Sequence, residues 1–243
     1  MKSIKRRRII PSQARSRVVE KYKDGGKRKA FFYVRGEKVG WRRWDEQGRL
    51  FSECAMKDGL NHGPCRYFNS DGSVDWEVTY SRGKLHGLTR QYGIGGRLIG
   101  VCRMDHGTGA DLWFAEEQDG QIKLSEERYF HEGRWHGFER WWFGDEHRIY
   151  AENHFVNGIL HGIHREWNDK GNLRRGFPKY FINGEQVTKR RYLQATRNDV
   201  SLPPFNNIDN QPRRPPPIAL MQESLNLAAT RAADRPGRLD GRE

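Results

Sequence analysis

Hydrophobic and polar residues between residues 30 and 188 alternate in short segments separated by glycine, a pattern typical of β-strands joined by turns. One glycine recurs in seven copies, 23 to 26 residues apart, and the residue three positions before it is always aromatic or methionine. The glycines are Gly36, Gly59, Gly83, Gly107, Gly133, Gly158 and Gly184. The residues before them are Tyr33, Met56, Tyr80, Met104, Phe130, Phe155 and Phe181. A period kept over so many copies predicts a repeat protein.

A second column follows the reference glycines. It reads His62-Gly63, His86-Gly87, His136-Gly137 and His161-Gly162, with Val39-Gly40 in the first copy and a contracted His106-Gly107-Thr108-Gly109 in the fourth. Asp58-Gly59, Asn157-Gly158 and Asn183-Gly184 are dipeptides that tolerate positive φ, as a type I′ turn requires. Each copy is therefore predicted to be an antiparallel β-hairpin of about two dozen residues.

Side chains alternate between the two faces of a sheet, so the columns predict two unlike faces. One face carries a ladder of glutamates and arginines: Glu53, Glu77, Glu127 and Glu152 with Arg43, Arg66, Arg90, Arg140 and Arg165. The other carries an aromatic and methionine stripe, which we predict to bind a partner through Trp44, Met56, Tyr67, Tyr80, Trp113, Phe130, Trp141 and Phe155. Tyr92 and Trp167 stand one residue late and indicate bulges. A single-layer sheet leaves the stripe uncovered unless curvature, a flanking segment or a partner closes it.

The pattern aromatic-x-x-Gly-x-x-His-Gly-x-x-x-x-(Trp/Tyr) over residues 30–188 resembles the MORN-repeat variants, in particular bacterial proteins labelled YwqK-type antitoxins. The resemblance implies an all-β, elongated, single-layer array of about six to seven antiparallel hairpins. It also implies a scaffold or binding surface, since MORN modules are linked to protein dimerisation and to phospholipid. Neutralisation of a toxin protein is implied by the family label alone. The seventh copy departs from the pattern because it lacks His-Gly.

The net charge of +13 is concentrated at the two ends of the chain. Residues 1–29 hold twelve Lys or Arg and two acidic residues, whereas residues 30–188 are nearly balanced. We expect residues 1–29 to form a flexible basic arm, whose anion-binding residues would be Lys5, Arg6, Arg7, Arg8, Arg15 and Arg17. Such an arm binds an anionic membrane or nucleic acid by releasing counterions, or it is a solvated tail. Tyr22 is its single aromatic residue, which argues against base stacking.

Beyond the repeats, the sequence predicts a short capping helix over residues 189–197. Thr188 suits its N-cap, and Val187 and Tyr192 suit a hydrophobic staple. Residues 198–243 are expected to form a proline-rich linker and a disordered tail. Within the tail, Ile218, Met221, Leu225, Ala228 and Ala232 fall on one helical stripe over residues 218–233. That segment is either a marginal helix or one that docks on a partner or on the protein's own aromatic stripe.

Catalytic and metal chemistry find little support in the sequence. The histidines recur with the hairpin period and lack neighbouring ligands, so a turn-stabilising role is favoured over metal binding. The glutamate column is interpreted as a structural ladder rather than as paired catalytic carboxylates. Cys54, Cys65 and Cys102 are odd in number and form no Cys-x-x-Cys pair, which predicts neither a zinc site nor a disulfide framework and favours a reducing cytoplasm. We therefore expect no enzyme, metal or cofactor.

The functional hypothesis with most support is a non-catalytic repeat scaffold that binds a macromolecule, most simply a protein, through the aromatic stripe. The alternative is binding of an anionic membrane or nucleic acid through residues 1–29. The third is antitoxin activity. The mean hydropathy of −0.97 and the lack of an apolar run of about 18 residues predict no transmembrane segment.

Overall fold

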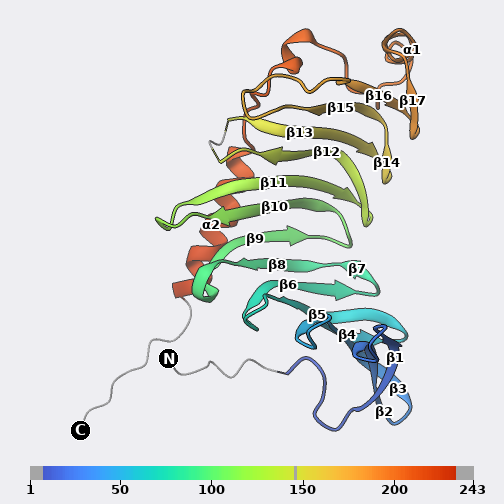
Figure 1. The fold of residues 1–243 in the computed structure, drawn as a ribbon, viewed down its shortest axis with the longest axis vertical. Coiled ribbons are helices and arrows are strands. Elements are labelled where there is room, and N and C mark those ends of the chain that lie inside the picture. The colour runs from blue at the N-terminus through green and yellow to red at the C-terminus, as the bar shows by residue number, and fades with distance from the viewer. Residues whose placement is uncertain (1–7, 145–146, 234–243) are drawn as a thin grey trace. The chain divides into compact units, whose positions relative to one another are not determined.

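The computed structural model describes residues 8–144 and 147–233, and it confirms an all-β fold of antiparallel hairpins (Figure 1). The chain forms two compact units. The first unit comprises residues 1–97 and 103–106, and the second comprises residues 98–102 and 107–243. Neither helix in the described part of the chain has the length and apolarity needed to cross a membrane.

The first sheet has nine strands in the order β1-β2-β3-β4-β5-β6-β8-β9, with β7 paired to β6. Their bounds are β1 Arg15–Lys21, β2 Lys27–Val34, β3 Glu37–Trp44, β4 Leu50–Lys57, β5 Leu60–Phe68, β6 Val74–Ser81, β7 Lys84–Leu85, β8 Gly87–Tyr92 and β9 Leu98–Met104. A short 3-10 turn, η1 (Ile94–Gly96), joins β8 to β9. Residues 98–102 of β9 belong to the second unit.

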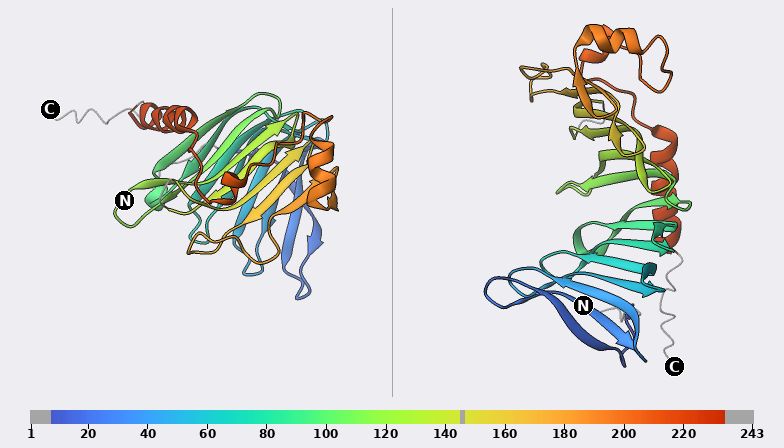
Figure 2. Two further views of the ribbon diagram at one scale, coloured as in Figure 1. Left: turned by 90° about the horizontal axis from the view of Figure 1, so that it is seen from above. Right: turned by 90° about the vertical axis from the view of Figure 1, so that its right-hand side faces the viewer.

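The second sheet has eight strands in the order β10-β11-β12-β13-β15-β16-β17, with β14 paired to β13. Their bounds are β10 Gly109–Glu116, β11 Ile122–His131, β12 Arg134–Trp142, β13 Ile149–Val156, β14 Ile159–Leu160, β15 Gly162–Glu166, β16 Lys179–Ile182 and β17 Glu185–Val187. The helices of this unit are α1 (Lys189–Ala195) and α2 (Ile218–Ala233), and between them lies a 3-10 turn, η2 (Asn207–Asn210). Figure 2 shows α2 beside the strands of this unit.

The repeat is built on one turn geometry. The seven reference glycines have φ between 77° and 87°, and the residue before each has φ between 46° and 52°. Two successive positive φ values define a type I′ turn, whose twist matches that of the flanking strands. The prediction from Asp58, Asn157 and Asn183 is therefore confirmed. Arg35, Arg82 and Glu132 adopt the same conformation although their side chains do not favour it, and His106 adopts it as well.

Four of the seven turns also bond to the preceding repeat through their main chain. The amide of Gly83 donates to the carbonyl of Asn61 at 2.9 Å, and that of Gly184 donates to Leu160 at 2.8 Å. The Gly133 and Gly158 amides make the same bond, to Gly107 at 2.8 Å and Trp135 at 2.7 Å. Consecutive hairpins are therefore coupled by main-chain atoms at the turns as well as along the strands.

The histidine column serves these turns, as the sequence predicted. The Nδ1 atoms of His62, His86 and His161 accept hydrogen bonds from the main-chain N–H of the turn residue one hairpin later, at 3.3, 3.3 and 3.0 Å. In the contracted copy, Thr108 Oγ1 takes this place and accepts from Glu132 at 3.0 Å. Since an imidazolium has no acceptor, this bond requires the neutral ring with its proton on Nε2.

We expect His161→Ala to destabilise the second unit by about 1–3 kcal/mol, because it leaves the Asn183 amide without its partner. His161 is 2% exposed, and its Nε2 also lies 3.1 Å from Ser201 Oγ. Urea denaturation followed by tryptophan fluorescence measures the loss. His136→Ala is the matched control, because His136 belongs to the same column but is exposed, and its expected cost is below about 0.5 kcal/mol. Equal losses in the two variants would contradict the assigned role.

The core of the first unit corrects the expectation for the cysteines. Cys54 and Cys65 lie directly opposite each other on β4 and β5, with Cα atoms 4.0 Å apart, and form a disulfide. Sequence spacing misses this pair because the hairpin, not a Cys-x-x-Cys motif, brings the two residues together. Together with Val78 they form a fully buried cluster beneath Trp41 and Tyr67. The cysteine content thus no longer favours a reducing compartment.

The N-terminal boundary also differs from the expectation. Residues 15–29 were assigned to a flexible arm, but Arg15–Lys21 forms β1 and pairs with β2 in register from Arg15 opposite Tyr33. The composition of β1 hides the strand, because five of its seven residues are charged or polar and only Val18 and Val19 are apolar. Ile10 is also buried, and it packs against the main chain at Gly40.

The C-terminal segment packs on the second sheet. Helix α1 begins at the predicted N-cap, where Thr188 Oγ1 accepts from the Arg191 amide at 3.3 Å, and Tyr192 is fully buried against Tyr180. Helix α2 spans the predicted residues 218–233. Its Met221 joins a core cluster with Leu124, Trp142 and Trp167, while Ser224 Oγ accepts from the Val101 amide at 2.9 Å. This segment therefore belongs to the folded unit and is not a free tail.

Candidate functional site

The charged ladder exists in the first unit with one correction. Glu53 lies directly opposite Arg66, and Glu77 lies opposite Arg66 and Arg90, so these residues share what we call the Glu53 face. Arg66 Nε donates to Glu77 at 2.7 Å. In the first copy the partner of Glu53 is Arg42, at 3.1 Å, and not the predicted Arg43. The reason is a shift of register, since Gly40 lies opposite Ala55 whereas Gly63 lies opposite the aromatic Tyr80.

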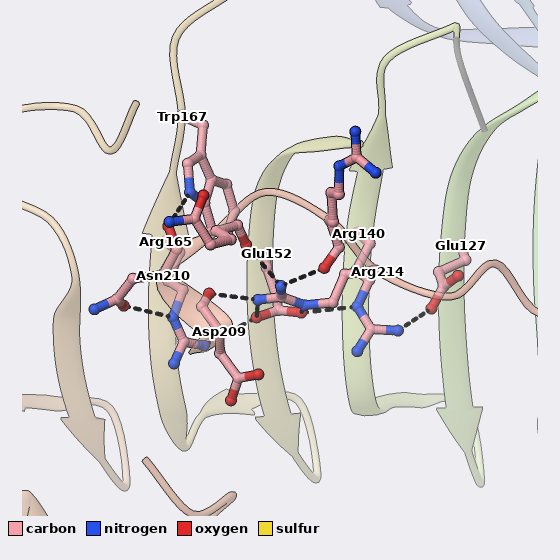
Figure 3. A network of polar contacts seen from close by, with 10 residues as sticks. Glu127, Arg140, Glu152, Arg165, Trp167, Asp209, Asn210 and Arg214 are labelled. Atoms are coloured by element: carbon pink, nitrogen blue, oxygen red, sulfur yellow. Dashed lines mark hydrogen bonds and ion pairs between the residues drawn. The ribbon is translucent and has the colours of Figure 1, made fainter. Parts of the chain in front are cut away.

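In the second unit the ladder continues as Glu127, Arg140, Glu152 and Arg165, which pair in one row across the sheet (Figure 3). Arg140 bridges Glu127 at 2.7 Å and Glu152 at 2.8 Å. We call this side of the second sheet the Glu127 face. Leu112 lies in the same row, so the main apolar core and the ladder share a face.

Arg214 is the residue that closes this network, and sequence reasoning missed it. It reaches Glu152 with both Nε and Nη2 at 2.9 Å, and its Nη2 also donates to the carbonyl of Asp209 at 2.7 Å (Figure 3). Glu152 thereby accepts from three arginines, since Arg165 donates at 2.9 Å. Burial alone would raise the pKa of Glu152, but Arg214 and Arg140 lower it to about 2. Burial raises the pKa of Glu127, which has Arg140 as its arginine partner.

The burial of this ladder differs from the sequence expectation of a solvated polar face. Glu127 is 0% exposed, Glu152 1% and Arg165 3%, and Arg214 and Asn210 of the C-terminal segment contact Glu152 and Arg165. The Arg213-Arg214 pair followed by three prolines is typical of a linker, and nothing local shows that Arg214 inserts into a sheet. The network has perturbed pKa values, yet it is closed and its groups bind one another. We interpret it as a clamp that holds the C-terminal segment on the sheet.

The opposite side of the second sheet, which we call the Trp141 face, carries the predicted aromatic residues. Trp113, Glu126, Trp141, Ala151 and Glu166 pair in one row. A parallel row contains Asp111, Arg128, Glu139 and Asn153. Phe130 and Phe155 follow two residues after Arg128 and Asn153, so all four predicted aromatic residues of this unit share the face. The stripe is therefore interleaved with charges, which the column analysis did not show.

The Trp141 face has a shallow hollow of about 390 Å³, lined by Trp141, Tyr150, Ala151, Asn153, His164, Glu166 and Arg174. Tyr150 stands at a bulge between the Trp141 and Trp142 pairings and is 41% exposed. Near it, Glu166 lies 3.3 Å from His164 Nε2 and 3.8 Å from Arg174. Trp135, 39% exposed, packs edge-on against Phe155 with ring centroids 4.8 Å apart. Aromatic rings thus alternate with polar groups across this surface.

Tyr150 and Trp135 are the residues of this surface that sequence reasoning missed. Both lie where the strand register slips: Tyr150 at a bulge, and Trp135 opposite Phe130 where two residues of β12 are skipped. The one-residue bulge moves the side chain of Tyr150 to the other face, so a strict alternation misplaces it. Trp135 keeps the parity of Trp141 but lies outside the repeat columns. The irregular segment Gly144-Asp145-Glu146-His147 is the sequence signal that precedes the bulge.

The other predicted site residues lie in the first unit. Met56, Tyr67 and Tyr80 share a face with Cys54, which we call the Cys54 face, and Trp44 lies at a register shift where its carbonyl accepts from the Tyr22 hydroxyl at 2.8 Å. Of the predicted anion-binding residues, Arg8, Arg15 and Arg17 are exposed. Lys5, Arg6 and Arg7 lie outside the described residues.

One side-chain cluster of the first unit has the composition of a metal site. His86, Asp105 and His106 place three ligand atoms within 4.8 Å of one another. Both imidazole Nδ1 atoms are engaged within the protein, however: that of His86 accepts from the His106 amide at 3.3 Å, and that of His106 lies 2.7 Å from Asp105. The cluster arises because the histidine column meets a turn whose own residue is histidine.

Comparison with known proteins yields little. No family model matches the chain, and no curated protein matches it. Among solved structures, TarM is similar over 37% of this chain and 19% of its own, at 14% identity and a TM-score of 0.21. A GtfA/B complex bound to UDP and GlcNAc is similar over 58% of this chain and 24% of its own, at 12% identity and a TM-score of 0.18. The chain thus spans less than a quarter of either structure, and likenesses this slight assign it neither a family nor an activity.

Proposed function

We propose that the protein is a non-catalytic scaffold that binds a protein partner through the Trp141 face of its second unit. One observation supports this most: the chain uses its own C-terminal segment to bury the Glu127 face, whereas on the other side of the same strands Tyr150 and Trp135 are exposed and Trp141 is half-buried. Contiguous aromatic surface that a protein does not cover itself usually marks an interaction site.

The composition of the face favours a protein as the partner. Tryptophan, tyrosine and arginine dominate the energetics of protein interfaces, and Trp141, Tyr150 and Arg174 lie together around the hollow. The glutamates and the asparagine beside them provide the polar groups that fix a partner's orientation. Since the strands are coupled from turn to turn, the aromatic side chains are presented on a rigid sheet.

Photo-crosslinking in cells of the source organism tests the proposal. We expect Tyr150→p-benzoylphenylalanine to give a discrete protein adduct, and Leu193→p-benzoylphenylalanine to give none. Tyr150 is 41% exposed on the Trp141 face, and Leu193 is a matched control because it is 38% exposed on α1, which packs on the Glu127 face. An adduct of twice the chain mass would identify a second copy as the partner.

Replacing the central ring should remove the partner. We expect Trp141→Ala to weaken the captured complex at least about thirtyfold, as for an interface hot spot, with the near-UV circular dichroism otherwise retained. Phe51→Ala is the control, since Phe51 is an aromatic residue of the first unit that is 50% exposed. The proposal would be overturned if the Tyr150 probe gave no protein adduct, or if the adduct formed unchanged in the Trp141→Ala variant.

A further inference from the structure

The first unit carries a separate surface on which basic and aromatic side chains alternate. On the Cys54 face, Arg17, Phe31 and Trp41 lie in one pairing row across β1, β2 and β3. Lys29 and Arg43 pair in the next row, and Arg15, Tyr33 and Lys38 form the row on the other side. We call this surface the basic-aromatic platform: Arg15, Arg17, Lys29, Phe31, Tyr33, Lys38, Trp41 and Arg43.

The cations of the platform lie around the aromatic rings. The ammonium groups of Lys29 and Lys38 are 5.0 and 4.6 Å from the centre of the Phe31 ring. The guanidinium of Arg43 is 5.3 Å from the centre of the Trp41 ring. Trp41 is fixed by a hydrogen bond from its Nε1 to Asn61 Oδ1, at 2.9 Å. The surface therefore combines positive charge with ring faces of fixed orientation.

These cations differ from the arginines on the other side of the same strands. On the Glu53 face, Arg42, Arg66 and Arg90 are each bound to a glutamate. On the platform, Arg15, Arg17, Lys38 and Arg43 form no ion pair with any described residue and are exposed. Glu20 at the outer edge is the carboxylate of this surface, 3.9 Å from Lys29. The excess of positive charge is thus available to an anionic ligand.

The aromatic part of the surface continues across the next strands. Tyr67 and Trp76 lie directly opposite each other in the row that contains Arg43, with ring centroids 4.9 Å apart. Together with Trp41 they pack over Cys54, Cys65 and Val78, which are 0% exposed. The three rings are half-buried, so they form the outer layer of this cluster.

We propose that the basic-aromatic platform binds single-stranded nucleic acid, with phosphates held by the cations and bases stacked on the rings. Single strands are bound in this way because every base has a π-face and every linkage carries a negative charge. A duplex hides its base faces, and stable binding to an anionic membrane requires apolar side chains inserted beside the charges, whereas the rings of this platform are half-buried. The sequence objection that residues 1–29 contain a single aromatic residue does not hold, because β2 and β3 supply the rings.

Binding to a fluorescent oligothymidine of about 20 nucleotides, measured by anisotropy with the full chain, tests this inference. We expect saturable binding that quenches tryptophan fluorescence and weakens about tenfold or more as salt rises from about 50 to about 200 mM. A hairpin duplex of equal length and vesicles containing phosphatidylserine are compared under the same conditions. Both should bind at least about tenfold more weakly.

Two variants separate stacking from charge. We expect Phe31→Leu to weaken oligothymidine binding about five- to hundredfold, because a leucine fills the space but offers no ring. Arg17→Ala combined with Arg43→Ala should weaken binding at least about tenfold and flatten the salt dependence. Lys57→Ala combined with Lys84→Ala is the control, because it removes two exposed cations that lie on the Glu53 face.

Several outcomes would overturn the inference. They are the absence of oligothymidine binding at about 50 mM salt, tighter binding of the duplex or of the vesicles, and an equal loss of affinity in the lysine control. If Phe31→Leu bound oligothymidine as tightly as the wild type, the surface would be a general polyanion site without base stacking. That result would also reject the inference. If Phe31→Leu perturbs the fold, the combined Arg17→Ala and Arg43→Ala variant still tests the inference, because both arginines are exposed.

Discussion

Replacing Glu152 by Gln should destabilise the second unit by about 3–5 kcal/mol, which is a large part of the stability of an ordinary domain. The substitution keeps the shape of the side chain but removes the one negative charge that Arg140, Arg165 and Arg214 share. The buried guanidinium groups of Arg165 and Arg214 would then face a neutral amide, whereas Arg140 keeps its pair with Glu127. Buried charges without a partner are far costlier than a missing surface pair. Chemical denaturation monitored by near-UV circular dichroism measures the loss.

Glu166→Gln is the control for this experiment. Glu166 belongs to the Trp141 face, where its side chain is 31% exposed and lies 3.3 Å from His164 and 3.8 Å from Arg174. Because solvent screens these contacts, we expect a loss below about 1 kcal/mol. Comparable losses in the two variants would show that the clamp contributes no more than a surface ion pair.

Comparison of the wild type with Glu152→Gln also predicts how the stability difference changes with pH. The pKa of Glu152 falls from 4.5 in the unfolded chain to about 2 in the folded state. A lowered carboxyl pKa stabilises the fold above the unfolded value, and this contribution is lost as pH falls toward the folded value. The stability difference between wild type and Glu152→Gln should therefore be constant above pH 4.5 and shrink below it. A difference that grows on acidification would refute the assignment.

Trp167→Ala should cost about 3–5 kcal/mol and release the C-terminal segment from the sheet. Trp167 is 1% exposed in the main core cluster, and its Nε1 donates to the carbonyl of Asn210 at 2.7 Å. The guanidinium carbon of Arg214 lies 5.5 Å from its ring centre. The variant thus opens a cavity and removes the contacts of Trp167 with Asn210 and Arg214, which hold residues 209–214 against the sheet. Limited trypsin digestion should cleave the bond between Arg213 and Arg214 faster than in the wild type.

Trp135→Ala is the control, because it removes the same type of side chain from an exposed position. Trp135 is 39% exposed and contacts Phe155 edge to face, so we expect a loss near 1 kcal/mol and unchanged digestion between Arg213 and Arg214. If Trp167→Ala left the digestion pattern of wild type, the C-terminal segment would have to be held by contacts other than those around Trp167.

Local signals explain why the hairpins could be predicted from the sequence. Two signals act over only a few residues: the residue-glycine pair with positive φ at each turn, and the period of two along each strand. They place Glu53 opposite Arg66, and Met56 on the same face as Tyr67, as the structure confirms. The His-Gly column is equally local in origin. Bulges are the first source of error, since one extra residue moved Tyr150 and shifted the partner of Glu53 from Arg43 to Arg42.

Long-range contacts explain what could not be predicted. The sequence indicated a helix over residues 218–233 but not the face it covers, because that choice depends on pairs such as Ser224 with Val101 and Arg214 with Glu152, 123 and 62 residues apart. An arginine beside prolines has the same local signature whether it is solvated or inserted into a sheet. Likewise, the rings that join Arg17 on the platform come from β2 and β3, not from its own segment.

The bonds between successive turns bear on how such a protein changes during evolution. The donor is the amide of a glycine and the acceptor is a carbonyl of the repeat before it, so recognition between neighbours demands little of the side chains. A duplicated or deleted copy would meet the same acceptor with the same donor, and its new neighbours would need few compensating substitutions. Gain and loss of whole copies is thus an accessible way for this architecture to alter the extent of its surface, while the two specialised ends stay in place.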